Sequence, residues 1–202
     1  VVVGAIAIRI VAWSGDAGLS DDAYRYLWEG EVVIEGASPY GVAPDDGPAR
    51  ELSSTADLRL RYPDLWARVN HKEVRAAYPP LAQSVGATVA ALCRWFDAAP
   101  ETTGIRILRA VFGACDLLVL WPLAKLLQRA RLPGALGVVW GWCPLPAIEF
   151  AGAGHLDSLG ILLLVGAFAA EPPRTEIGGK GSKDTTRGLV PIVLLCAGIL
   201  TK

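Results

Sequence analysis

Several ionisable side chains stand at the predicted ends of apolar segments, where they could perform acid–base chemistry. Asp21 and Asp22 form an adjacent pair of carboxylates, which can accept a proton or hold a cation. His155 and Asp157 stand where another apolar segment begins. Ionisable groups are costly within hydrocarbon, so each is a functional candidate if these segments cross a membrane. A structural alternative stays open for the aspartates, because acidic residues after Ser20 suit the N-terminus of a helix.

The composition indicates a membrane protein. Apolar residues make up 52% of the 202-residue chain and charged residues 19%, below the roughly 25% typical of soluble domains. The formal net charge is -1, so no basic field indicates nucleic-acid binding. None of the 4 cysteines has zinc-binding spacing. The chain lacks Met and both its ends lie in apolar runs, so we expect it to be a fragment of a longer protein.

Alternating apolar and polar segments predict an all-α, polytopic membrane protein. Apolar helices of about 20 residues can span the bilayer. The polar residues 14–103 are expected to form one large loop outside the membrane, and 81–96 within it suits a helix lying at the interface. The predicted spans are residues 1–13 (the end of a first span), 104–127, 132–150, 156–170 and 188–202.

Within this loop, apolar residues at helical spacing predict an amphipathic helix that begins near Ala23. Tyr24, Tyr26 and Trp28 on this helix are interpreted as membrane-interface anchors, with sugar stacking as the alternative. Asp116 lies in the middle of a predicted span and needs a partner or a water-filled cavity. We interpret it as a structural tether between helices.

The distribution of basic residues predicts which side of the membrane each loop faces. If residues 81–96 lie on the surface, seven basic residues are cytoplasmic; if 81–96 crosses the membrane, only Arg94, Arg106 and Arg109 are. Basic residues favour the cytoplasmic side, so the loop 14–103 is expected to be extracytoplasmic. The seven residues are Lys125, Arg129, Arg131, Arg174, Lys180, Lys183 and Arg187.

The order of several short motifs resembles that of the GT-C glycosyltransferases. Residues 20–30 (SDDAYRYLWEG) and 36–40 (GASPY) are similar to the first outer loop of bacterial polyprenol-phosphate-mannose-dependent α-mannosyltransferases. They are more distantly similar to the mannosyltransferase of GPI-anchor synthesis. Tyr78-Pro79-Pro80-Leu81 resembles the turn that opens the juxtamembrane helix of these enzymes. Further likenesses lie at 114–118, 140–158 and 201–202, although Cys143 stands where relatives usually carry Asn.

The resemblance implies that this is the N-terminal part of a GT-C module in a bacterial plasma membrane. Such a module moves a hexose, here expected to be mannose, from a polyprenyl-phosphate donor to a hydroxyl of a glycan or lipid-linked acceptor, with inversion. The reaction needs a general base near the hydroxyl and positive charge or donors at the phosphate. Asp21 or Asp22 is the expected base, and Lys202 the implied phosphate contact, with Arg25 or Arg106 as alternatives.

Other residues are expected to bind substrate or shape the site. His155 and Asp157 could orient the sugar or the loop aspartates, with a helix cap as the alternative; Tyr78 and its two prolines are expected to shape the loop. No cofactor is required, but a divalent cation could bind where Asp21 and Asp22 adjoin Asp157. A single His/Asp pair is no zinc signature.

Two other functions stay open. A transporter would line a polar path with Asp116, Glu149 and Asp157, but it predicts inverted repeats of broken helices, which the sequence does not show. A non-catalytic scaffold for envelope assembly would use the outer loop as a docking surface. It predicts that Asp21 and Asp22 are dispensable.

Overall fold

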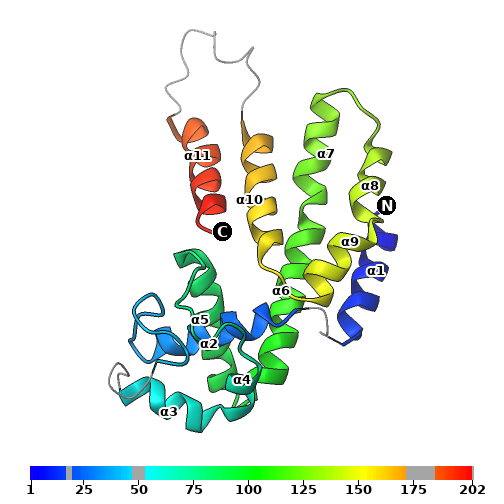
Figure 1. Ribbon diagram of the computed structural model, residues 1–202. Helices are drawn as coiled ribbons and strands as arrows, with labels where there is room; N and C mark the ends of the chain where they lie inside the picture. Colours follow the sequence, from blue (N-terminus) through cyan, green and yellow to red (C-terminus); the bar gives the residue numbers. More distant parts are fainter. Residues whose placement is uncertain (17–19, 47–52, 172–184, 202) are drawn as a thin grey trace.

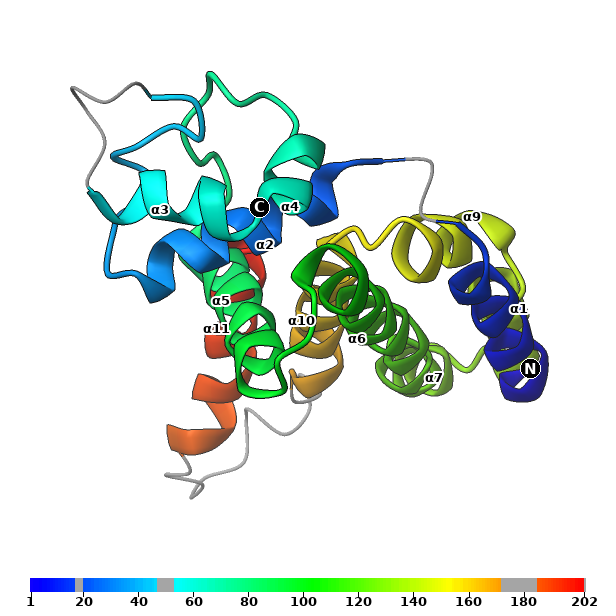
Figure 2. The same ribbon diagram turned by 90° about the horizontal axis from the view of Figure 1, so that it is seen from below.

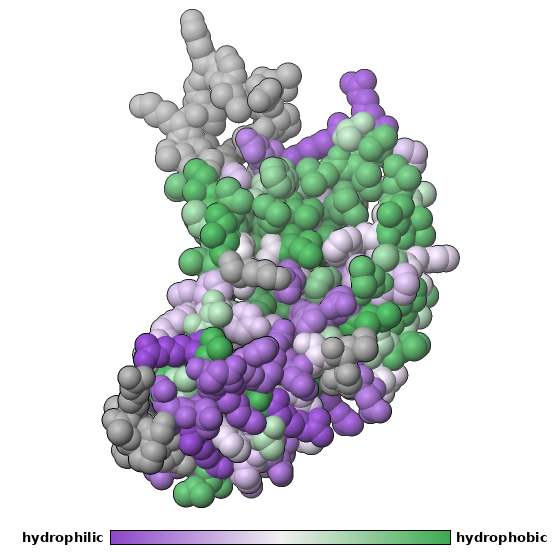
Figure 3. Space-filling model, viewed as in Figure 1, coloured by the Kyte–Doolittle hydropathy of each residue, from purple (hydrophilic) through white to green (hydrophobic). Residues whose placement is uncertain are grey.

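The computed structural model describes residues 1–16, 20–46, 53–171 and 185–201, and it confirms an all-α fold, with no strand in these residues. Figure 1 shows an upper group of apolar helices and a lower, mostly polar group, and Figure 3 shows the same division on the surface. The apolar helices are α1 (Val2–Ser14), α6 (Ile105–Leu118), α7 (Leu120–Arg129), α10 (Asp157–Ala170) and α11 (Thr185–Ile199), and α6 reaches down beside α2 and α5. The lower group is α2 (Asp22–Ile34), α3 (Ser53–Arg61), α4 (Pro63–Arg68) and α5 (Pro80–Trp95).

One helix of the described part is long and apolar enough to cross a membrane. It runs over Pro100–Arg129, 30 residues, and joins the π-helical turn η1 (Pro100–Gly104) to α6 and α7. At about 1.5 Å per residue it exceeds a hydrocarbon core of roughly 30 Å. The apolar helices α1 and α10 have 13 and 14 residues, too few to span alone. A polytopic arrangement therefore stays a prediction.

The segment 132–150, expected to be one span, is broken into short pieces. Pro144 lacks a backbone N–H, and the residue before it, Cys143, is extended (φ -65°, ψ 125°), as residues before proline tend to be. The sequence therefore cannot continue one helix through this point. The pieces are η2 (Gly134–Gly137), α8 (Val138–Gly141), α9 (Pro144–Pro146) and the π-helical η3 (Ala147–Gly152).

A buried ion pair ties this broken segment to its neighbours. Arg9 Nε on α1 donates to Asp116 Oδ2 on α6 at 2.7 Å, and the two side chains are 4% and 0% exposed. Arg9 also donates to the backbone carbonyl of Gly141, at the end of α8. Asp116 therefore has the partner that its burial requires, in keeping with its interpretation as a tether.

The helix α2 is buried on all sides, which corrects the prediction of a single apolar face. Every residue from Ala23 to Val32 is buried, including Tyr24, Tyr26 and Trp28, so these aromatics are core residues and not interface anchors. Figure 2 shows the reason: α2 lies between α3 and α4 on one side and α5 on the other. Its charged residues are paired inside; Arg94 Nε on α5, for example, donates to Glu31 at 2.7 Å.

Two glycines allow α2 and α5 to cross in backbone contact. A methyl group added at Gly86 would collide with the carbonyl oxygen of Tyr26, and one at Gly30 with the backbone of Gly86. We expect Gly86→Ala to lower the free energy of unfolding by about 1–3 kcal/mol, the usual cost of overpacking. Thermal unfolding in detergent, followed by circular dichroism, measures it. Gly134→Ala is the control, because nothing lies within 4 Å of its added methyl group; equal effects would contradict the crossing.

Candidate active site

The fold places Asp22 in a polar cluster at the start of α2. Ser20 Oγ accepts a hydrogen bond from the Asp22 backbone N–H at 3.3 Å, and Asp22 Oδ1 accepts one from Asn70 Nδ2 at 2.7 Å. The loop between α4 and α5, which carries Asn70, therefore holds the carboxylate. Asp21 occupies the N-cap position, is exposed, and forms no capping hydrogen bond through its side chain. The two predicted base candidates thus have different surroundings.

Two tyrosines continue this cluster. Tyr78 lines the same cavity as Asp22, and its ring meets that of Tyr26 edge to face with centroids 4.7 Å apart. Burial, and then the charge of Asp22, raises the pKa of Tyr78 to about 12. Burial also raises the pKa of Tyr26, and the charges of Tyr78, Asp22 and Asp157 add to this. Both phenols stay protonated at neutral pH and are hydrogen-bond donors there.

His155 reaches the same carboxylate from the other half of the fold. Its Nδ1 lies 2.7 Å from Glu149 Oε2, and its Nε2 lies 3.9 Å from Asp22 Oδ2 with no hydrogen-bond partner. Gly154, in the left-handed conformation (φ 81°), makes the turn that brings His155 there. Glu149, within η3, thus orients the ring and aims Nε2 at Asp22.

Arg25 has a structural position in this site. The buried guanidinium donates to Glu29 Oε1 at 2.6 Å and to the backbone carbonyls of Asn70 at 3.0 Å and His71 at 2.7 Å. A further hydrogen bond goes to the carbonyl of Val74. These bonds fix the loop that carries Asn70. Direct contact of Arg25 with substrate, as predicted, is not tested by this geometry.

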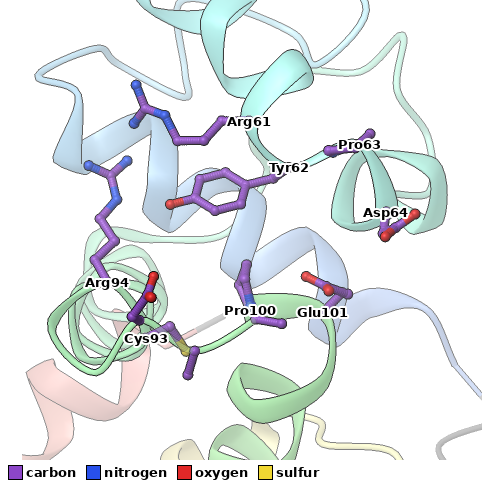
Figure 4. A pocket seen from close by; sticks show the side chains of 11 residues that line it. Arg61, Tyr62, Pro63, Asp64, Cys93, Arg94, Pro100 and Glu101 are labelled. Atoms are coloured by element: carbon purple, nitrogen blue, oxygen red, sulfur yellow. The ribbon is translucent and has the colours of Figure 1, made fainter.

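A cavity of about 130 Å³ opens beside Asp22, and Arg25, Asn70 and Tyr78 are among the residues that line it. Asp157 lines a different cavity, of about 270 Å³, between α10 and α11. The charges of both aspartates raise the pKa of Tyr26. A third cavity, of about 260 Å³, lies at the far end of α2, where Figure 4 shows Tyr62 between Arg61 and Arg94. Since α2 has 13 residues, about 20 Å of helix separates it from Asp22.

Some predicted features cannot be placed. Lys202 lies outside the described residues, as do the basic residues Arg174, Lys180 and Lys183. Within the described residues, no group of three or more His, Cys, Asp or Glu side chains could hold a metal ion. A divalent cation near Asp21, Asp22 and Asp157 therefore stays a prediction.

Sequence reasoning did not assign Asn70, Glu149 and Tyr26 to the site. Asn70 and Asp22 are 48 positions apart, and no local pattern pairs them. Glu149 enters the sequence analysis only as part of a transporter's polar path, and its position six residues before His155 is the one local sign of a partnership. Tyr26, predicted to be an interface anchor, is a buried core residue beside Tyr78.

The contact between Glu149 and His155 can be tested by mutation. Because Glu149→Leu removes the acceptor that holds the ring, we expect it to lower the rate of the reaction by up to about 100-fold, the effect of a misplacement of about 1 Å. Glu149→Gln keeps an acceptor oxygen and should lose less. The measurement is sugar transfer by membranes bearing the full-length protein. A Glu149→Leu rate equal to that of the unmutated protein would show that the reaction does not depend on the contact between Glu149 and His155.

Comparison with known proteins gives the family. The family model described as "Alpha-(1->6)-mannopyranosyltransferase, N-terminal domain" matches residues 19–202. The chain belongs to this family. A probable alpha-(1->6)-mannopyranosyltransferase of Mycolicibacterium smegmatis (strain ATCC 700084 / mc(2)155) is 29% identical over 198 residues, covering 89% of this chain and 32% of the relative. No solved structure matches the chain.

Membership of the alpha-(1->6)-mannopyranosyltransferase family confirms the resemblance to bacterial α-mannosyltransferases. The chain spans about a third of the length of the relative that it matches. All the site residues that the structure describes, Asp21, Asp22, Arg25, Tyr78, His155 and Asp157, lie within the matched residues 19–202.

Proposed function

We propose that this chain forms part of an integral membrane α-mannosyltransferase that takes its sugar from a polyprenyl-phosphate donor. The family and the relative support mannosyl transfer, and the long apolar helix supports a place in the membrane. The observation that carries the proposal is the position of Asp22. It lines a cavity, and Asn70, Tyr78 and His155 meet around it from three separate segments.

In the proposed reaction, Asp22 accepts the proton of the acceptor hydroxyl. The hydroxyl oxygen attacks the anomeric carbon of the mannosyl donor, the bond between this carbon and the phosphate oxygen breaks, and the polyprenyl phosphate leaves. One such displacement inverts the anomeric centre. A carboxylate suits the base role because the hydrogen bond from Asn70 Nδ2 holds it in one orientation.

The departing phosphate gains negative charge and needs positive charge beside it. Lys202 is the contact implied by the family resemblance. Arg106 is a second candidate, because it is exposed near the start of α6 and forms no ion pair with the described residues.

We place this reaction on the extracytoplasmic side of a bacterial plasma membrane. The helix α2, which begins at Asp22, belongs to the lower group in Figure 1, while the end of α7, the helix that carries Lys125 and Arg129, is at the upper end. Basic residues favour the cytoplasmic side, which leaves Asp22 outside. The acceptor is a hydroxyl of a glycan or of a lipid-linked glycan.

Label transfer tests this function. Membranes bearing the full-length protein are given radiolabelled polyprenyl-phospho-mannose or, as the matched alternative donor, a labelled nucleotide mannose. We expect label in a glycan acceptor from the lipid donor alone, in a linkage whose anomeric configuration is inverted. Transfer only from the nucleotide sugar would contradict the proposed donor, and no transfer from either would contradict the proposed enzyme.

A further inference from the structure

An apolar groove runs between α1 and α6 in the upper half of the fold. It encloses about 230 Å³, with Ile6, Ile10 and Trp13 on one wall and Ala110, Ala114 and Leu117 on the other. Figure 2 shows the two helices side by side. The groove exists because large α1 side chains face small side chains on α6, which leaves room between the helices. Ile6, Ile10 and Trp13 are 40%, 59% and 39% exposed, so the groove opens to the surroundings.

The lower end of the groove carries an excess of positive charge, because Arg106 and Arg109 lie near a single carboxylate, that of Asp16. Arg109 is buried there and donates only to backbone carbonyls, those of Ala151 at 3.1 Å, Ala12 at 3.0 Å and Gly15 at 2.8 Å. Arg106 lies one helical turn away and is exposed. Neither guanidinium forms an ion pair within the described part of the chain. Two neighbouring cations at the end of an apolar groove suit an amphiphile with an anionic head group.

This charged end adjoins the Asp22 cluster. A methyl group added at Gly154 would lie 3.1 Å from Arg109 Cγ and 3.5 Å from Ala23 Cβ. Arg109 therefore packs close to Ala23, the residue after Asp22, and to His155, which follows Gly154. An anion at the arginines would lie next to the proposed base.

Trp13 indicates how deep in the membrane the charged end of the groove lies. Its indole Nε1 donates to the carbonyl of Arg106 at 3.1 Å, which ties the end of α1 to the start of α6. Tryptophan favours the boundary between hydrocarbon and head groups. The apolar part of the groove therefore extends into the hydrocarbon, and the arginines stand at head-group level.

We infer that the α1–α6 groove binds the prenyl chain of the lipid-phosphate donor, with the phosphate at Arg106 and Arg109. The inference rests on the proposed function, and it says where the polyprenyl-phosphate donor binds. The chain lies along Ile10 and Ala114, and the phosphate at the arginines presents the sugar to Asp22.

Donor chain length tests the groove. Full-length protein is assayed with decaprenyl-phospho-mannose and geranyl-phospho-mannose, as the unmutated form and with Ala114→Phe, which fills the groove. We expect Ala114→Phe to raise the KM for the decaprenyl donor about tenfold, the effect of losing about two buried methylene groups, and to leave the KM for the geranyl donor nearly unchanged. Val111→Phe is the matched control, because Val111 is 38% exposed on the same helix and does not line the groove.

A head-group variant and a photoprobe complete the test. Arg106→Gln should raise the KM for both donors, because both carry the phosphate. A prenyl phosphate with a diazirine on its chain should label peptides of α1 or α6, in competition with decaprenyl phosphate. Unchanged KM values in Ala114→Phe, or labelling only elsewhere in the protein, would overturn the groove while transfer itself persists. Absence of transfer in the unmutated protein would instead contradict the proposed function.

Discussion

Asp22→Asn should lower the rate of mannosyl transfer by about 100- to 10,000-fold, the contribution that a positioned general base makes. Asparagine has the size of aspartate, and its side-chain oxygen can still accept the hydrogen bond from Asn70 Nδ2, which is 2.7 Å long in the unmutated protein. The substitution therefore removes the base while keeping the shape of the cluster. The measurement is label transfer by membranes bearing the full-length protein.

Asp21→Asn is the matched control for this prediction. Asp21 is the adjacent aspartate, but its side chain is exposed and forms no capping hydrogen bond. We expect only a small loss of rate, with expression and helix content equal to those of Asp22→Asn. A large loss in Asp21→Asn and none in Asp22→Asn would move the base to Asp21. Full activity in both, and in the double variant, would remove the loop aspartates from the chemistry.

Asp116→Ala should destabilise the fold by about 3–5 kcal/mol, the cost of leaving one partner of a buried ion pair uncompensated. Arg9 is 3% exposed and Asp116 is fully buried, so water cannot replace the lost carboxylate. The loss should also loosen the end of α8, because Arg9 donates to the carbonyl of Gly141. Thermal unfolding of the protein in detergent, followed by circular dichroism, measures the change.

Two further variants show whether the loss of stability in Asp116→Ala comes from leaving a buried charge unpaired. Arg61→Ala removes an exposed pair, since Arg61 Nη1 and Glu35 Oε1 are 2.8 Å apart and the Arg61 side chain is 46% exposed; exposed pairs contribute about 0–1 kcal/mol. The double variant Arg9→Met with Asp116→Leu should recover most of the stability, because it leaves no buried charge. A single Asp116→Ala variant as stable as Arg61→Ala would contradict the tether.

Local signals predicted where several elements begin and end. The apolar run of residues 81–96 predicts a helix, and the resemblance of Tyr78-Pro79-Pro80-Leu81 to a family turn implies its start; α5 starts at Pro80 because proline suits the first turn of a helix. The acidic pair after Ser20 indicated the start of the next helix, and α2 begins at Asp22. Such features depend on residues close together in the chain, so the sequence alone reveals them.

Features that depend on distant contacts could not be predicted in this way. The polar residues of α2 suggested a solvent-facing side, but partners such as Arg94, 63 positions away from Glu31, bury them. Arg9 and Asp116 are 107 positions apart. In the site, Asp22 and His155 were both candidates, yet their meeting depends on the packing of two separate parts of the fold. Hydropathy predicted one continuous span over residues 132–150 and did not reveal that Pro144 breaks the helix there.

Single turnover of the purified full-length protein tests most directly whether Asp22 is the base. Unmutated protein and Asp22→Asn are each loaded with labelled polyprenyl-phospho-mannose, and acceptor is then added in excess. The account predicts that both bind the donor equally, and that Asp22→Asn transfers the label at least about 100-fold more slowly. Transfer by Asp22→Asn at the unmutated rate would contradict it.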